Sequence, residues 1–196
     1  MNVQHINIKF YVQNPGEVEL EKYSGIFNQW IQRHAMEELL VDVADYLHVY
    51  DGPGVILIGH EANYSLDNTA GRLGLLYNRK AQLEGITPYK LIQAAHAALS
   101  AAHLLEKENG VKFNGREAQI ILNDRLIAPN TAETLSALEP DLKIFFDKLY
   151  NGAKYTLTCH STDPRERFIV DVNSLSDFNV ETLLENLSVE TEPAHV

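Results

Sequence analysis

Apolar and polar residues alternate along the first segment of the chain. Ile6, Ile8 and Phe10 fall on one side of this segment, with polar residues between them. A period of two is typical of a strand with one buried face. After the turn at residues 14–16, apolar residues recur every three or four positions across residues 20–31, which predicts a helix packed by one side on a sheet. The chain therefore opens with a strand and then a helix.

The same two periods divide the remainder of the chain. They predict further strands at residues 39–50, 54–60, 73–77, 118–122, 154–160 and 167–172. Further helices are expected at residues 88–109, 130–149 and 177–187, and a loop rich in turn-forming residues at 61–71. The order is β-α-β-β-β-α followed by β-α-β-β-α. It predicts an α+β fold, with an antiparallel or mixed β-sheet of about seven strands packed with four main helices.

The length of 196 residues suits a single domain, expected at residues 1–187, followed by a flexible acidic tail at 188–196. The second half of the chain repeats the element order of the first half minus one strand. We interpret residues 1–110 and 116–187 as a possible pseudo-repeat. Because the halves share little residue identity, separate use of a common α+β unit is the alternative.

The composition is that of an ordinary globular protein, with 45% apolar and 22% charged residues. No apolar run approaches the roughly 20 residues that cross a bilayer, so no membrane partner is expected. The first ten residues have neither a basic start nor a continuous apolar stretch, which favours a cytoplasmic location. The single cysteine cannot form an internal disulfide, and in a strand its neighbour His160 points to the other face.

The net charge of −11 makes nucleic acid an unlikely partner, because a negative field repels phosphate. The α-β-β-β-α order of residues 20–109 resembles the topology of double-stranded-RNA-binding domains, which would imply RNA binding. Such a domain needs a basic cluster at its second helix. The alanine-rich run at residues 94–105 occupies that place, so the resemblance is one of topology alone.

Histidines and carboxylates are concentrated between residues 46 and 68, the part of the chain with the most candidate chemistry. His60 is the candidate general base, with Asp42 or Asp67 as the carboxylate that orients its ring. This argument assumes that the turn at residues 51–53 sets Tyr50 opposite Gly54. A structural role for His60 at a strand end, beside turn-forming Asn and Asp residues, is the alternative.

Residues near His60 form the candidate ligand-binding set: Asp51, Glu61, Asn63, Tyr64, Asn68 and Arg72. No metal site is expected. In the assumed register His48 and His60 lie roughly 13 Å apart, and His96 and His103 lie about 10.5 Å apart along a helix, too far to share one ion. We interpret His96 and His103 as polar residues beside the helix core, and the alanines around them as sites of close intramolecular packing. No cofactor can be assigned.

The predicted face with Tyr46, His48 and Tyr50 also carries Ile56 and Ile58, which is too apolar to leave in water. A second subunit would cover it, so a homodimer is expected, and extra helices on that face are the alternative. The leading hypothesis is a non-catalytic dimeric binding or assembly module, with a protein or small molecule as partner. The alternative is a small-molecule enzyme of hydrolase or lyase type, with a His60-centred acid-base or metal site.

Overall fold

The structure is a computed structural model that describes residues 1–159, 163 and 165–188. Its helices are α1 (Tyr23–Gln32), α2 (Thr87–Asn109), α3 (Ala132–Leu149) and α4 (Val180–Leu187). Its strands are β1 (Ile6–Val12), β2 (Leu40–Tyr46), β3 (Gly54–Gly59), β4 (Ala62–Asp67), β5 (Gly74–Arg79), β6 (Phe113–Leu122), β7 (Tyr155–Cys159) and β8 (Phe168–Ser174). The predicted α+β class is confirmed, and the predicted tail lies, beyond Ser188, outside the described residues.

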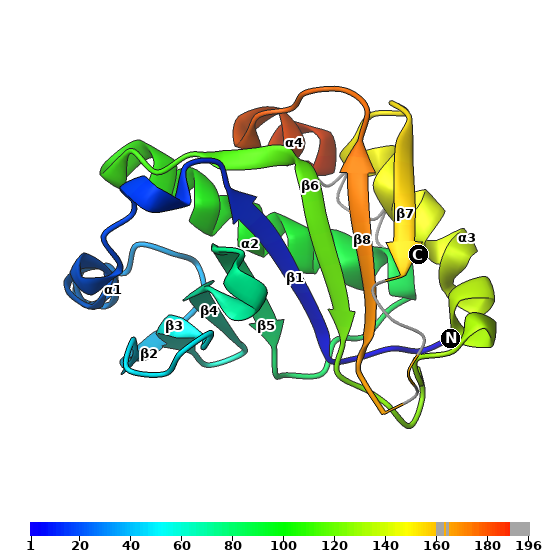
Figure 1. Ribbon diagram of the computed structural model, residues 1–196, viewed down its shortest axis with the longest axis horizontal. Coiled ribbons are helices and arrows are strands. Elements are labelled where there is room, and N and C mark those ends of the chain that lie inside the picture. The colour runs from blue at the N-terminus through cyan, green and yellow to red at the C-terminus, as the bar shows by residue number, and fades with distance from the viewer. Residues whose placement is uncertain (160–162, 164, 189–196) are drawn as a thin grey trace, which may run out of the picture.

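The strands of the described chain form one sheet of eight in the order β2-β3-β4-β5-β1-β6-β8-β7. Every neighbouring pair is antiparallel. In each half the first strand pairs with the last strand of the same half, β1 with β5 and β6 with β8, and β1 and β6 meet at the centre (Figure 1). The two halves thus connect their first and last strands in the same way. That they arose by duplication remains a prediction.

The eighth strand is β4, in a segment predicted to be a loop. Ala62, Tyr64 and Leu66 are buried on the side of the helices, and polar residues alternate with them. The other face of this part of the sheet is covered by no α-helix among the described residues, so turn-forming residue types such as Asn63 and Ser65 can occupy it. The loop prediction failed because those residue types were taken as evidence of turns, when here they line a polar sheet face.

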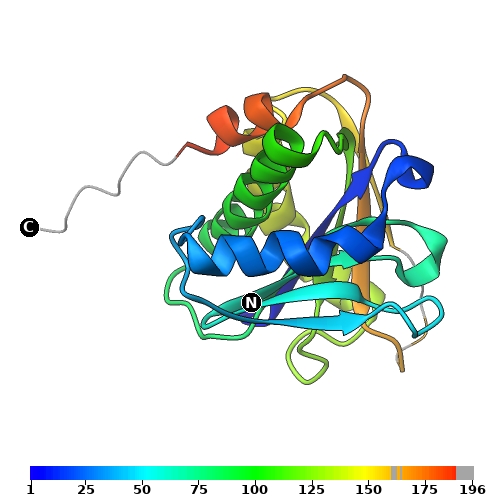
Figure 2. The same ribbon diagram turned by 90° about the vertical axis from the view of Figure 1, so that its left-hand side faces the viewer.

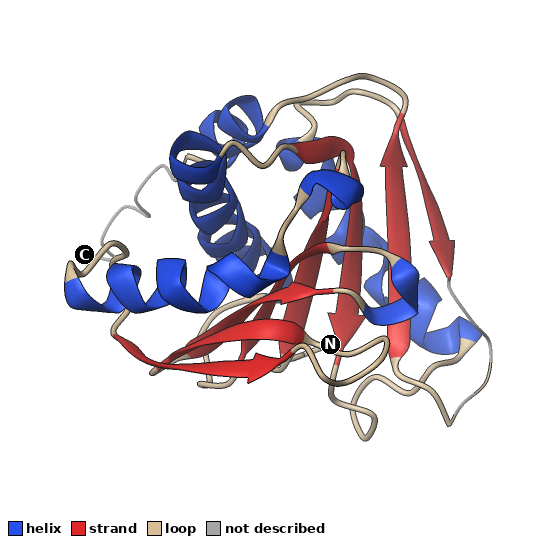
Figure 3. Cartoon of the chain, turned by 60° about the vertical axis from the view of Figure 1, so that its left-hand side comes forward, coloured by secondary structure: helices blue, strands red, loops and turns tan. Residues whose placement is uncertain are grey.

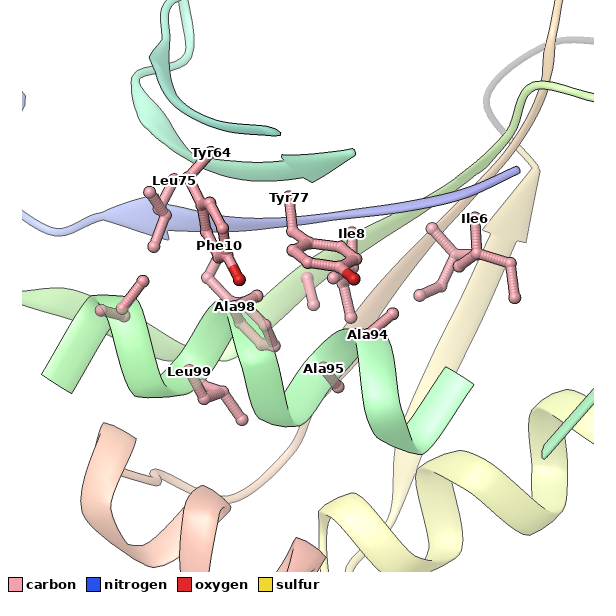
Figure 4. Close-up of a cluster of buried hydrophobic side chains, with 14 of the residues drawn as sticks. Ile6, Ile8, Phe10, Tyr64, Leu75, Tyr77, Ala94, Ala95, Ala98 and Leu99 are labelled. Carbon is pink, nitrogen blue, oxygen red and sulfur yellow. The ribbon is translucent and has the colours of Figure 1, made fainter. Parts of the chain in front are cut away.

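All four helices pack on one side of the sheet, with α1 over β2 and β3 and α2 over β1 and β5 (Figure 2). Ala94, Ala95 and Ala98 of α2 face the sheet and are at most 1% exposed. Because their side chains are small, the backbone of α2 can approach the sheet closely. Figure 4 shows this contact, in which the facing sheet residues are Ile6, Ile8, Phe10, Tyr64, Leu75 and Tyr77. The predicted role of the alanines in close intramolecular packing is confirmed.

The other face of the sheet points toward the viewer in Figure 1, where β1, β6 and β8 lie in front of α2. It is mainly polar, and we call it the open face. In its centre the Lys9 ammonium lies 2.5 Å from the Asp67 carboxylate, and both residues are nearly fully buried. No helix within the described residues is long and apolar enough to cross a membrane.

A charged contact fastens α1 to the end of α2. The indole N–H of Trp30 donates to the carboxylate of Glu108 at 3.0 Å, and the guanidinium of Arg33 donates to both oxygens of that carboxylate. The Arg33 hydrogen bonds, followed by the one from Trp30, lower the pKa of Glu108 from its usual 4.5. A depressed carboxyl pKa stabilises the fold above the unfolded pKa, and that stability is lost as pH falls through the folded pKa.

We therefore expect acid to release this contact only below pH 4.5, the ordinary Glu value. Trp30 is the single tryptophan, so its fluorescence emission reports the event directly. Glu108→Gln should change the emission at neutral pH, reduce stability by about 1 kcal/mol and remove the acid transition. Glu185→Gln, at an exposed position of α4, is the control that should leave all three unchanged. If Glu108→Gln keeps the acid-induced change in Trp30 fluorescence, that change is caused by the titration of another group.

Candidate functional site

A cavity of about 580 Å³ lies between the segment after α1, the β3–β4 turn and the outer side of α2. The helix contributes polar and small residues at spacings of three and four positions, which place them on one stripe. These residues are Gln93, His96, Ala97, Ser100, His103 and Leu104. The sheet and its loops contribute Ala35, Met36, Glu37, Glu38, Leu39, His60, Glu61, Tyr64, Tyr77 and Arg79. We call this space the His60 cavity.

Glu38 fixes the β3–β4 turn that carries His60 into the cavity. One oxygen of its carboxylate accepts hydrogen bonds from the backbone N–H groups of Glu61 and Ala62, each at 2.7 Å. The other oxygen accepts from the Tyr64 hydroxyl at 3.0 Å. Gly59 permits this approach, since a Cβ there would lie 2.4 Å from the Glu38 carboxylate. Burial, followed by the nearby Glu38 charge, raises the pKa of Tyr64 far above its ordinary value.

Arg79 forms the inner wall of the cavity, with only 8% of its side chain exposed. It donates to the backbone oxygen of Ala81 at 3.0 Å and to the side-chain oxygen of Gln93 at 3.1 Å. Its guanidinium also lies 3.0 Å from the Glu61 carboxylate and donates to the Tyr77 hydroxyl. These partners hold the charged group in place, so Arg79 and Glu38 build a rigid frame.

The free chemistry of the cavity lies in its three imidazoles. Within the part of the chain that the structure describes, His60, His96 and His103 form no side-chain hydrogen bond or ion pair. Glu61 keeps 52% of its side chain exposed beside them. No group of three His, Cys, Asp or Glu side chains among the described residues could hold a metal ion. The arrangement can accept and donate protons and hydrogen bonds to a molecule in the cavity.

Only part of the candidate set from the sequence meets at this cavity. His60, Glu61 and Tyr64 line it. Asn63, between Glu61 and Tyr64, alternates to the open face. Asp42 lies on β2 opposite Ile58, and its carboxylate accepts the backbone N–H of Val43.

The candidate residues Asp51, Asp67, Asn68 and Arg72 lie at the other end of β4, about 20 Å from the β3–β4 turn at about 3.3 Å per residue. Asp67 binds Lys9 and Thr69 there. No hydrogen bond or ion pair in the described structure joins the His60 ring to Asp42 or Asp67.

The separation of His60 from Asp67 follows from the length of β4, and its separation from Asp42 follows from the register of β2. Tyr46 pairs with Gly54, so the assumed pairing of Tyr50 with Gly54 is wrong. Residues 47–53 form a longer turn instead, in which the N–H groups of Leu47 and Val49 donate to Asp45 and Tyr46 at the end of β2. His60 consequently lies beside Leu39, whose backbone oxygen accepts the His60 N–H at 2.8 Å.

Arg72 belongs to a separate arrangement on the open face. Its guanidinium stacks 3.7 Å above the centre of the Tyr11 ring and pairs with Glu117. Asp51 accepts the N–H of Gly71 at 2.8 Å and so ties the same segment to the β2–β3 turn. Burial raises the pKa of Tyr11 to about 12. A smaller hollow of about 360 Å³ opens beside this cluster. Together with the hydrogen bonds from Thr69 to Asp67, these contacts fasten residues 68–72 beside the Lys9–Asp67 pair.

Sequence reasoning did not connect the helix residues and Arg79 with His60. His96, Ser100 and His103 form a polar stripe at helical spacing next to the buried alanines, and this stripe was the available signal. Nothing in the local pattern marks Glu38, because its role depends on the position of the β3–β4 turn. No family model, curated protein or solved structure matches the chain.

Proposed function

We propose that the protein binds a small molecule in the His60 cavity. The observation that carries this proposal is the convergence of three imidazoles without side-chain partners, in the described structure, on one space. The volume of about 580 Å³ falls within the roughly 300–1,000 Å³ common for ligand sites. The wall is held by internal contacts of Glu38 and Arg79, so the cavity is shaped before a ligand arrives.

The lining defines the chemistry of the proposed ligand. The three carboxylates of Glu37, Glu38 and Glu61 outnumber the single guanidinium of Arg79, so the carboxylates and the guanidinium together give the lining a negative balance. Apolar contacts come from Met36, Leu39, Ala97 and Leu104. A neutral or cationic molecule with an apolar body and N–H or O–H donors fits this wall. Anionic ligands are disfavoured, because the carboxylates would repel them.

Ligand binding is tested first by native mass spectrometry of protein purified without chelator, and then by thermal-shift screening of small amines and polyols. We expect a bound mass or a stabilising compound whose affinity falls at least tenfold in His60→Ala. The exposed His60 side chain makes little packing contact, so the variant should stay within about 0.5 kcal/mol of wild-type stability. Ala97→Phe, which fills the cavity from α2, should also remove binding.

The matched control is His48→Ala, because His48 is exposed and lies outside the cavity, stacked on Tyr46. It should bind every compound with wild-type affinity. Equal binding by wild type and Ala97→Phe would place the ligand elsewhere and contradict the proposal.

The second candidate function is an enzyme that uses the same imidazoles for acid-base chemistry, with His60 as base. The free ring of His60 beside the half-exposed Glu61 favours it. The two functions differ in the fate of the bound molecule. A binding protein returns the compound unchanged, whereas an enzyme changes its mass, and His60→Gln would abolish that change while binding persists.

Two further expectations from the sequence remain proposals. We propose that the protein is a homodimer, which the same native mass spectrum tests by its oligomeric mass. A cytoplasmic location is likewise proposed, and fractionation of cells that express the full chain tests it.

A further inference from the structure

The outer edge of β2 carries backbone groups that no other strand of the described sheet pairs. The N–H of Val43 is bonded to the Asp42 carboxylate at 2.8 Å, and the N–H of Leu47 to the Asp45 carboxylate at 2.9 Å. Neither therefore enters the ladder with β3. Since alternate residues of an antiparallel strand point to the same edge, the N–H of Asp45 also points outward. Figure 3 brings the side of the molecule that contains β2 and β3 forward, with α1 packed on one face of these strands.

Large apolar side chains surround this edge without being covered. Leu39 is 60% exposed, Val41 57% and Tyr46 40%. Tyr50, in the β2–β3 turn, is 98% exposed. Natural sheets usually protect an edge with lysine, proline or a covering element, because a bare apolar edge pairs with other strands. On β2 the charged residues Asp42 and Asp45 occur beside the exposed apolar side chains of Leu39, Val41 and Tyr46, so the edge is charged and apolar together.

The charge of this region is one-sided. Residues 34–71 contain seven Asp and Glu residues and no Lys or Arg. Asp67 and Glu61 have cationic partners in Lys9 and Arg79. Among the described residues, Asp42 and Asp45 form no ion pair. These two carboxylates belong to β2, so its edge combines exposed apolar side chains with negative charge that no ion pair neutralises.

We propose that the outer edge of β2 binds an extended, basic segment of a partner protein, which adds to the sheet as a strand beside β2. Backbone hydrogen bonds to the outward groups would supply affinity, and lysine or arginine side chains would pair with Asp42 and Asp45. In the free protein those two carboxylates occupy outward N–H groups. A basic partner draws them away and opens the edge, whereas an acidic or neutral strand does not.

The charge argues against a second copy of this chain as the occupant. In an antiparallel β2–β2 pair centred on Val43, the two Asp42 side chains would lie on the same face as close diagonal neighbours. Like charges directly opposite each other destabilise a strand pair, and at the roughly 7–8 Å of a diagonal pair the repulsion is weaker but has the same sign. A basic partner is attracted by the same carboxylates, so charge complementarity favours a basic segment over a second copy of this chain.

The test uses a nine-residue synthetic peptide that alternates valine with lysine and threonine. Its binding to the protein is measured by fluorescence anisotropy of the labelled peptide. Two control peptides replace lysine by glutamate, or every second valine by proline. We expect binding of the lysine peptide alone. When the peptide is bound, hydrogen exchange should show new protection within residues 41–46, at the amides that point outward, because only those amides gain backbone partners.

Two variants separate strand addition from general attraction to an acidic protein. Val43→Pro removes an outward N–H that the β2–β3 ladder does not use, and it should weaken binding at least tenfold. The double variant Asp42→Lys with Asp45→Lys should do the same. Glu181→Lys with Glu185→Lys on α4 changes the total charge equally at a distant surface and should bind with wild-type affinity. Circular dichroism verifies the fold of each variant.

Three results would overturn the proposal. Equal losses in the β2 and α4 charge variants would show non-specific attraction. Protection outside residues 41–46 would place the peptide elsewhere. Protection of the same amides in concentrated protein without peptide, together with a dimer mass, would identify a second copy as the occupant. If Val43→Pro fails to fold, the hydrogen-exchange pattern and the two charge variants still show whether the peptide binds at the β2 edge.

Discussion

Asp67→Ala is expected to destabilise the protein by about 3–5 kcal/mol, because it leaves a buried lysine without its counter-charge. Lys9 is 3% exposed and Asp67 4% exposed. Burial lowers the pKa of Lys9 from its usual 10.5, and the charge of Asp67 opposes that shift. The loss is measured by urea unfolding at neutral pH, with Lys9→Met plus Asp67→Leu as the control. Replacing both partners by apolar residues should be close to neutral.

The same variant should show a defined pH dependence. A lysine whose folded pKa lies below its unfolded value penalises the fold while it is protonated in both states. In Asp67→Ala that penalty is complete below the folded pKa and shrinks as pH rises from there toward 10.5. The deficit relative to the Lys9→Met plus Asp67→Leu variant should therefore narrow in alkaline buffer. A deficit independent of pH would show that lost packing, rather than charge, is responsible.

Gly54→Ala is expected to cost about 2–5 kcal/mol for two reasons that add. Gly54 has φ +63°, a left-handed conformation that costs a residue with a Cβ about 1–2 kcal/mol. A Cβ would also lie 2.1 Å from the backbone oxygen of Leu66, on the neighbouring strand. This overlap forces β3 and β4 apart, and overpacking of this kind costs about 1–3 kcal/mol.

Gly71→Ala is the matched control for that experiment. Gly71 has φ +64°, but nothing lies within 4 Å of the Cβ it would gain. It should lose about 1 kcal/mol from backbone strain alone. Thermal unfolding of both variants gives the two values. Equal losses would mean that β3 and β4 adjust to the added methyl group without cost.

The fold was predictable where one face of an element is apolar and the other polar. The period in β1 and the stripe on α1 are of this kind, and both elements formed where expected. The failure at β4 has the opposite cause. Its polar residues face a sheet surface without helices, and Asp67 is buried there only because Lys9, far away in the chain, neutralises it. No local pattern contains that partner.

The candidate site was predictable only within one strand and its turn. His60, Glu61 and Tyr64 follow one another closely, so their proximity needs no knowledge of the topology. Their grouping with Asp42 required the register of β2, which depends on the length of the β2–β3 turn. The grouping of His60 with His96 required knowledge of which side of α2 faces the β3–β4 turn. That side is set by the packing of the alanines on the sheet.

The central position of β1 has a consequence for how the chain folds. β1 precedes β2 to β8 in the sequence but lies in the middle of the sheet, where its partners are β5 and β6. Strands β2 to β5 pair with their sequence neighbours, so they can form hairpins as they emerge. We expect the β2–β5 meander to assemble first, β1 to remain unpaired until residues 74–79 have left the ribosome, and its second edge to remain unpaired until residues 113–122 follow. The apolar residues of β1 are therefore the part of the nascent chain most in need of protection from aggregation.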